Sequence, residues 1–262
     1  MTCLRIWKRA LGFWMLAVTL SGGSGCLSFL NPVQQPPPEI LQSCLDLPKC
    51  SRDHVHVFLV NGLDPFNYGN LTGVRDYLHN LGFHQTYYGQ FFHTGWYKNE
   101  IHRIQKEDPE AHFVLIGFSL GMNVVDWLAK CLKEDGIFID LMVWLSGNHP
   151  VQPMPHERPE NVGRVVNILA SGIMQARGER DWAENHQPPK TGHFALPTNQ
   201  ETLEILAEAL RQVAAAVPVT EKKTSPVPSL EDSGPSPRPV MPKVSSKQDE
   251  WDFLKPVSRR KN

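Results

Sequence analysis

A serine between two glycines is the strongest chemical signal in this chain of 262 residues. Residues 117–121 read Gly-Phe-Ser-Leu-Gly, which fits the pattern G-x-S-x-G. The motif follows the apolar run 112–116 and precedes the helix-forming segment 122–132. A strand that turns sharply into a helix at a serine needs small residues two places before and after it, because side chains there would collide with the neighbouring backbone. The pattern predicts such a turn around Ser119; the alternative is a serine that only caps the helix.

A second apolar run, residues 55–60, leads into Asn61 and Gly62. With the serine turn, it makes the chain resemble the α/β-hydrolase family, in a small form closer to bacterial lipases, esterases and cutinases. In that family a His-Gly-type turn at this place supplies a peptide N–H that binds the oxyanion. Asn61 stands where the histidine is usual, and the glycine is kept. The resemblance implies that the backbone amides of Leu63 and Leu120 form the oxyanion hole.

The resemblance also implies that Ser119 is the nucleophile and that a histidine on a late loop is its general base. His193 fits this place, since it lies between Gly192 and Phe194 and ahead of the last expected helix, 199–215. The order serine, then histidine, is that of the family. Without the serine motif, His193 would be interpreted as an ordinary surface-loop residue.

The carboxylate that completes the family's triad is missing from both of its usual places. The expected strand 139–145 is followed by Ser-Gly-Asn, and the strand 164–169 by Ala-Ser-Gly-Ile-Met. Neither segment holds an aspartate or glutamate. The acid must therefore come from elsewhere, or the site works without one.

Asp181 is the aspartate on the connection that leads to His193, so it is the candidate for the acid. Glu179 and Glu184 are the next candidates. A Ser-His dyad oriented by a backbone carbonyl is the other possibility. Asp181 could also form only a surface ion pair with Arg180.

The elements that would position these residues alternate between apolar strands and amphipathic helices. The expected strands are 55–60, 83–89, 112–117, 139–145 and 164–169, and the expected helices are 70–81, 96–106, 120–134 and 199–215. This alternation predicts an α/β fold, a three-layer α/β/α sandwich with a mostly parallel central sheet, within a folded domain that spans 51–217. Asn61, Ser119 and the loop with His193 all fall at the carboxyl ends of strands, where ligands bind in such sheets.

The long connections 147–163 and 171–192 are polar or proline-rich, so we expect a minimal α/β-hydrolase with no large cap domain and an open site. Apolar residues near the motifs are the candidates for substrate binding: Phe66, Tyr68, Phe118, Met174 and Trp182. They suit an acyl or other hydrophobic ester group. They could equally be core or loop anchors.

The first 25 residues are typical of a signal peptide. Arg5, Lys8 and Arg9 precede the apolar run 11–20, which is too short for a spanning helix, since such a helix needs about 20 apolar residues. Small residues then lead to Cys26, an arrangement that resembles a bacterial lipoprotein processing site with Cys26 as the lipidated residue. Ordinary signal-peptidase cleavage and an uncleaved anchor are the alternatives. All three predict an exported domain in the cell envelope or beyond it.

A proline-rich lead-in, 26–50, and a Pro/Ser/Lys-rich tail, 218–262, flank the expected domain, and the tail is predicted to be disordered. In an oxidising compartment Cys44 and Cys50 could form a disulfide. Cys131, on the expected elbow helix, is interpreted as a buried free thiol.

Composition excludes some functions and leaves two hypotheses. The net charge of −1 gives no indication of nucleic-acid binding, and the eleven histidines form no H-x-x-x-H pattern, so neither a metal nor another cofactor is expected. The first hypothesis is a monomeric, exported serine hydrolase that acts on a small-molecule or lipid-like carboxylic ester. The second is a catalytically inactive hydrolase fold that serves as a binding module of the cell envelope.

Overall fold

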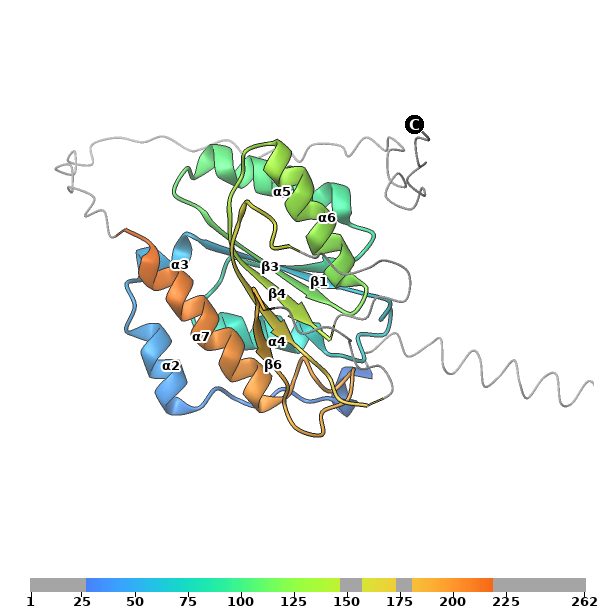
Figure 1. The fold of residues 1–262 in the computed structure, drawn as a ribbon. Coiled ribbons are helices and arrows are strands. Elements are labelled where there is room, and N and C mark those ends of the chain that lie inside the picture. Colours follow the sequence, from blue (N-terminus) through green and yellow to red (C-terminus); the bar gives the residue numbers. More distant parts are fainter. Residues whose placement is uncertain (1–26, 147–156, 173–180, 219–262) are drawn as a thin grey trace, which may run out of the picture. The chain divides into compact units, whose positions relative to one another are not determined.

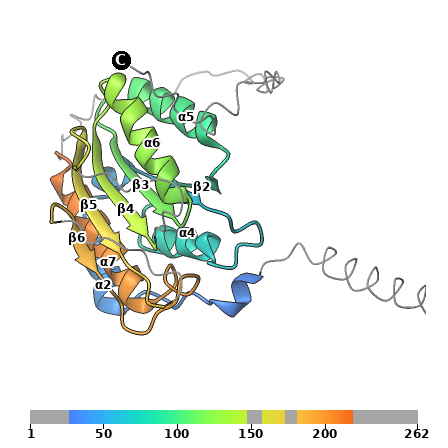
Figure 2. The ribbon, with the colours of Figure 1, turned by 45° about the vertical axis from the view of Figure 1, so that its right-hand side comes forward.

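The structure, a computed structural model, describes residues 27–146, 157–172 and 181–218. Six parallel strands form one sheet in the order β2-β1-β3-β4-β5-β6, and Figure 2 shows it from β6 at one edge to β2 at the other. The strands are β1 (Val55–Asn61), β2 (Thr86–Gln90), β3 (His112–Phe118), β4 (Ile139–Leu145), β5 (Val162–Ile168) and β6 (Glu184–His186).

Helices cover both faces of this sheet. On one face lie α5 (Thr94–Glu107) and α6 (Gly121–Glu134), and on the other lie α2 (Pro38–Leu45), α4 (Leu71–Asn80) and α7 (Gln200–Ala216) (Figure 1). A 3-10 turn, η1 (Leu27–Leu30), and the short helix α3 (Lys49–Asp53) complete the described elements. The expected three-layer α/β/α sandwich with a parallel sheet is confirmed.

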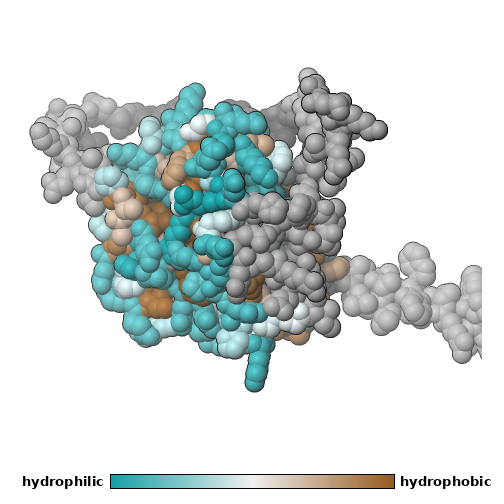
Figure 3. Space-filling model, viewed as in Figure 1, coloured by the Kyte–Doolittle hydropathy of each residue, from teal (hydrophilic) through white to brown (hydrophobic). Residues whose placement is uncertain are grey.

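Strand β1 shows why the layers form. All seven of its residues are buried, and alternate side chains enter opposite layers. Val57 and Leu59 pack with α2, α4 and α7, whereas Phe58 and Val60 pack with α5 and α6. A strand that is apolar on both faces is stable only between two layers of helices. The outer face that shows α2 and α7 is mostly hydrophilic, with small separate hydrophobic patches (Figure 3).

The ordered unit begins before the predicted start at residue 51. Helix α2 contacts α7, and Cys44 on α2 is buried in the core of that layer. The predicted disulfide is not formed, because Cys44 is a buried free thiol and Cys50 is an exposed one on α3. Cys131 is also free, but it is only partly buried.

One strand was not predicted. Residues 184–186, expected to be loop, form the short edge strand β6 beside β5. Cys26, Met174, Glu179 and the tail from residue 219 lie outside the described residues. Among the elements that are described, no helix is long and apolar enough to cross a bilayer.

Candidate active site

Ser119 occupies a sharp turn between β3 and α6. Its φ is +54°, in the left-handed region that L residues with a β-carbon adopt only at a cost. A β-carbon on Gly117 would lie 2.6 Å from Cα of Met122, and one on Gly121 would lie 2.1 Å from the Val60 carbonyl oxygen. Only glycine fits at these two positions, as the motif predicts. Ser119 is half-buried at the carboxyl end of β3.

The turn after β1 packs directly against this serine turn. A β-carbon on Gly62 would lie 2.6 Å from the Leu120 nitrogen and 3.0 Å from Cβ of Ser119. The glycine that the resemblance singles out is therefore needed for close backbone approach. The backbone amides of Leu63 and Leu120 donate no hydrogen bond to any described residue, so both remain available for an oxyanion.

Asn61, at the place of the usual histidine, shapes this turn. Its fully buried side-chain amide donates to the Asp64 carbonyl at 3.1 Å and to the Tyr88 hydroxyl at 3.2 Å. These bonds join the end of β1 to its own turn and to the neighbouring strand β2. Asparagine therefore has a clear structural role here.

His193 lies, like Ser119, at the carboxyl ends of the strands. Its hydrogen-bond partner is a serine that was not predicted from the sequence. Nδ1 of His193 is 2.6 Å from Oγ of Ser146, the residue that follows β4. Both side chains are buried, and Ser146 has a φ of +49°. The backbone N–H of Ser119 donates to the carbonyl of Leu145 at 3.0 Å, so the two serine turns are joined next to each other.

Aromatic rings hold the imidazole of His193 from two sides. The ring centroid of Phe118 is 5.0 Å away and that of Phe194 is 4.9 Å away. Phe118 directly precedes Ser119, so His193 adjoins the turn of Ser119. No hydrogen bond joins Ser119 to His193. In unliganded sites the contact between nucleophile and base is often longer than a hydrogen bond and shortens when substrate binds.

The loop that carries His193 is anchored at both ends. Asn199 caps α7 by accepting hydrogen bonds from the backbone of Glu201 and Thr202, and its amide donates to the Thr191 hydroxyl at 3.1 Å. The Thr191 carbonyl in turn accepts from the Ser171 N–H at 2.7 Å. The start of α7 and the end of β5 thus fix the position of the imidazole.

Burial and the charge of one carboxylate shift the pKa of His193 in opposite directions. Burial lowers its pKa, and the negative charge of Asp64 raises it to a smaller extent. Asp64 is itself buried, and its carboxylate accepts hydrogen bonds from the backbone of Tyr68 and Gly69, each at 2.7 Å. Asp64 was not predicted from the sequence, although it comes two residues after Gly62.

The structure does not bring the predicted acid to His193. Asp181 is exposed, and Asp64 is the carboxylate whose charge acts on the imidazole. Glu184 is also exposed and pairs with Arg164 across β5 and β6. Among the described residues, the Ser146 hydroxyl alone forms a hydrogen bond with the imidazole nitrogens.

The predicted substrate-binding residues are spread over several environments. Phe66 is exposed shortly after the turn of Gly62, and Tyr68 packs edge-on against Phe194 with ring centroids 4.9 Å apart. Phe118 is fully buried beneath His193. Trp182 packs against Trp144 in the layer of α5 and α6, the opposite side of the sheet from Phe118. Of the predicted residues that the structure describes, Trp182 is therefore the one on the opposite side of the sheet from His193.

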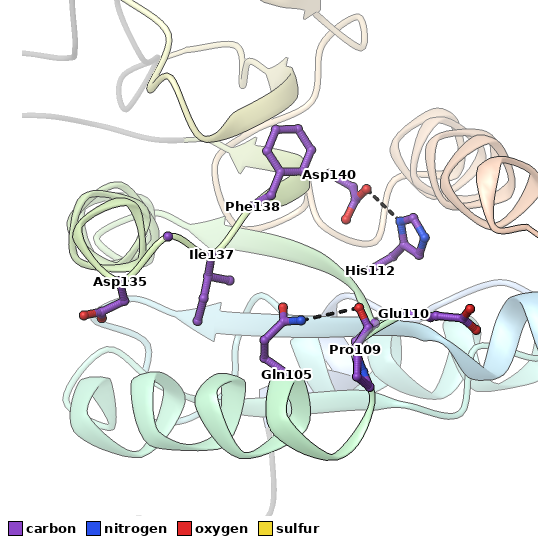
Figure 4. Close-up of a pocket in the computed structure, with 10 residues that line it drawn as sticks. Gln105, Pro109, Glu110, His112, Asp135, Ile137, Phe138 and Asp140 are labelled. Carbon is purple, nitrogen blue, oxygen red and sulfur yellow. Dashed lines mark hydrogen bonds and ion pairs between the residues drawn. The ribbon is translucent and has the colours of Figure 1, made fainter.

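A separate polar cavity of about 460 Å³ lies at the opposite end of the strands, where β3 and β4 begin. His112 and Asp140, paired at 2.7 Å, are among its lining residues (Figure 4). His112 begins β3 and Ser119 follows its end, so about 20 Å of strand separate them. Across the described ranges, no cluster of three or more His, Cys, Asp or Glu side chains could hold a metal ion.

Two solved hydrolase structures are similar to the chain at low sequence identity. A lidless α/β serine hydrolase from Xanthomonas campestris is 14% identical, with 71% of this chain and 88% of that chain covered and a TM-score of 0.45. A predicted CIB-like hydrolase from Thermoplasma acidophilum is 12% identical, with 60% and 86% covered and a TM-score of 0.40. No protein-family model matches the chain, and no curated protein matches it significantly. The roles of Ser119 and His193 therefore rest on the geometry of this chain.

Proposed function

We propose that the protein is a serine hydrolase that cleaves carboxylic esters through an acyl-enzyme on Ser119. The observation that carries this proposal is the strained turn of Ser119, at +54°, packed against the glycine turn of Gly62. Strain of this kind persists only where the surrounding structure enforces it, and it is concentrated at functional sites. A helix cap alone would not require it.

His193 acts as the general base in this proposal. With its proton on Nδ1, the neutral imidazole donates to Oγ of Ser146 and keeps the lone pair of Nε2 for the proton of Ser119. The Ser119 oxygen then attacks the ester carbonyl, and the alcohol leaves with the proton that His193 has taken up. Water, activated by the same imidazole, releases the acid.

Two backbone amides stabilise the charge that develops on the carbonyl oxygen. Those of Leu63 and Leu120 come from adjoining turns and have no other acceptor among the described residues. Fixed donors of this kind contribute about 3–4 kcal/mol each in comparable sites. They do not depend on a triad acid, which is consistent with the finding that no carboxylate of the described residues is hydrogen-bonded to His193.

The imidazolium that forms is stabilised without a directly bonded carboxylate. Ser146 is neutral, so the negative charge that favours the protonated ring is that of Asp64. A charge held by its own backbone hydrogen bonds stabilises the cation less than a direct ion pair. We therefore expect slower turnover than a complete Ser-His-Asp triad gives.

We also propose that the hydrolase acts after export. The support is the leader pattern of residues 1–25, in which a basic start and a short apolar run are followed by small residues and Cys26. The substrate would then be a small-molecule or lipid-like ester in or outside the cell envelope.

Covalent labelling tests the enzymatic proposal directly. A fluorophosphonate probe should modify Ser119 of the purified protein, and Ser119→Ala should abolish labelling. Ser43→Ala is the matched control, because Ser43 is an exposed serine on α2. Wild-type protein that resists a broad set of such probes would instead support the binding module.

A further inference from the structure

An apolar cavity opens beside the oxyanion turn. It has a volume of about 210 Å³ and lies where the turn after β1 meets the end of β2. It is lined by Gly62, Leu63, Pro65, Gln90, Phe91 and Phe92. None of these six residues carries a charge, so the cavity suits a hydrocarbon group.

Gln90 is the residue with a polar side chain at the cavity, and this side chain already forms a hydrogen bond within the protein. The side-chain amide of Gln90 donates to the Tyr88 hydroxyl at 3.1 Å, the same hydroxyl that Asn61 contacts. The Gln90 backbone N–H donates to Nδ1 of His93. A ligand in the cavity therefore does not have to replace these hydrogen bonds.

Large apolar side chains remain exposed at the cavity. Leu63 is 68% exposed and Phe92 is 38% exposed, and the ring of Phe92 packs edge-on against Phe91 at 5.4 Å. Leu63 also supplies one of the two proposed oxyanion amides. An apolar chain that covered these side chains would remove their surface from water.

The cavity is close enough to Ser119 to receive part of an ester bound there. Gly62 lines the cavity, and a β-carbon placed on Gly62 would lie only 3.0 Å from Cβ of Ser119. Strand β1 lies between β2 and β3, so the end of β2 is two strand spacings, about 10 Å, from the end of β3. A chain of several methylenes on the acyl carbon would cross the turn of Gly62 and Leu63 and enter the cavity.

We propose that this cavity is the acyl-chain site and that Phe91 and Phe92 select esters of unbranched, medium-length fatty acids. The proposal rests on the proposed function, because the acyl group must be held while it is bonded to Ser119. The alcohol, which leaves first, would face the open side of the site.

Rates with esters of graded acyl length test this proposal. We expect kcat/KM for p-nitrophenyl esters to rise about fourfold per added methylene from acetate toward octanoate and to level off when the cavity is filled. Phe92→Ala should lower the ratio of kcat/KM for octanoate to that for acetate at least tenfold. Phe138→Ala is the matched control, because Phe138 is an exposed aromatic residue directly before β4, at the end of the strands opposite the cavity.

A binding measurement separates failure of this proposal from failure of the proposed function. Octanoate should bind the Ser119→Ala protein in calorimetry, and adding Phe92→Ala should weaken binding at least tenfold. If octanoate binding depends on Phe92 but the wild-type protein hydrolyses no ester, the cavity binds acyl chains and the proposal of a serine hydrolase is wrong. Hydrolysis with a flat acyl-length profile, and octanoate binding unaffected by Phe92→Ala, would overturn the acyl site alone.

Discussion

Oγ of Ser146 lies 2.6 Å from Nδ1 of His193, and Ser146 directly follows β4, the strand next to β3, which leads to Ser119. In a triad, a carboxylate at Nδ1 both fixes the tautomer and stabilises the imidazolium. A hydroxyl can do the first and not the second. In the proposed mechanism these two tasks are therefore separate, with Ser146 orienting the ring and Asp64 supplying the charge.

Replacing Ser146 should slow hydrolysis without abolishing it. A neutral hydrogen bond contributes about 1 kcal/mol, so Ser146→Ala should lower kcat/KM about fivefold. Ser146→Asp should raise the pKa of His193, because a carboxylate at Nδ1 favours the protonated ring, and should move the midpoint of the pH–rate profile upward. Ser171→Ala, the serine that follows β5, is the control. An unchanged rate in Ser146→Ala, with His193→Ala inactive, would contradict this role.

Asp181 gives the complementary test. If Ser146 orients His193, Asp181→Asn should change kcat/KM less than threefold, because Asp181 is exposed and has no contact with the ring. Steady-state hydrolysis of one ester by both variants is sufficient. A fall of a hundredfold or more in Asp181→Asn would instead identify Asp181 as the triad acid, as the sequence suggested.

The pH dependence follows from the burial of His193. Its lowered pKa means that the neutral, proton-accepting ring persists to lower pH than for an exposed histidine. The pH profile of kcat/KM should therefore rise with pH and reach half-maximum below about 6.5. Asp64→Asn removes the charge that favours the protonated ring, so it should shift this midpoint further down.

An exposed carboxylate provides the control for that shift. Asp76 lies on α4, and its partner among the described residues is its neighbour Arg75, so Asp76→Asn should leave the midpoint unchanged. The amide oxygen in Asp64→Asn can still accept one of the two backbone hydrogen bonds, and a thermal melt will show whether the turn remains folded. A wild-type midpoint above 6.5 would contradict the burial argument.

The sequence predicted the parts of this site that depend on local rules. Gly117 and Gly121 are required by the backbone of one turn, so their spacing alone located Ser119. His193 was identified by its order in the chain. The Ser146 contact spans 47 positions and depends on how the His193 loop is anchored. A serine at a strand end is too common to indicate such a partner.

The fold, too, has parts that the sequence predicts and parts that it does not. The apolar runs of β1 and β3 predict a sheet buried on both faces, because no other arrangement covers them. Helix α2 was missed because it lies in a proline-rich stretch, where Pro38 occupies its first turn without interrupting it. Its stability comes from Cys44 and its neighbours packing on α7, a contact distant in sequence.

Export can be tested independently of catalysis. Cys26 should be the first residue of the mature protein and should carry lipid, because the apolar run 11–20 and the small residues after it precede Cys26 at the spacing of a lipoprotein leader. Mass spectrometry of the membrane fraction will identify the mature terminus, and Cys26→Ser should release the protein from that fraction. A mature start elsewhere in residues 21–28 would remove the anchor and keep export.

The strain at Ser119 should be visible in stability. An L residue at +54° costs about 1–2 kcal/mol, part of which glycine recovers despite its greater freedom in the unfolded chain. We expect Ser119→Gly to be more stable than Ser119→Ala by about 1 kcal/mol in urea unfolding, although both are inactive. Ser43 in α2 is the control, because there glycine should be less stable than alanine by about 1 kcal/mol. If Ser119→Gly were also the less stable variant, the turn would carry no strain, and the observation on which the nucleophile assignment rests would be lost.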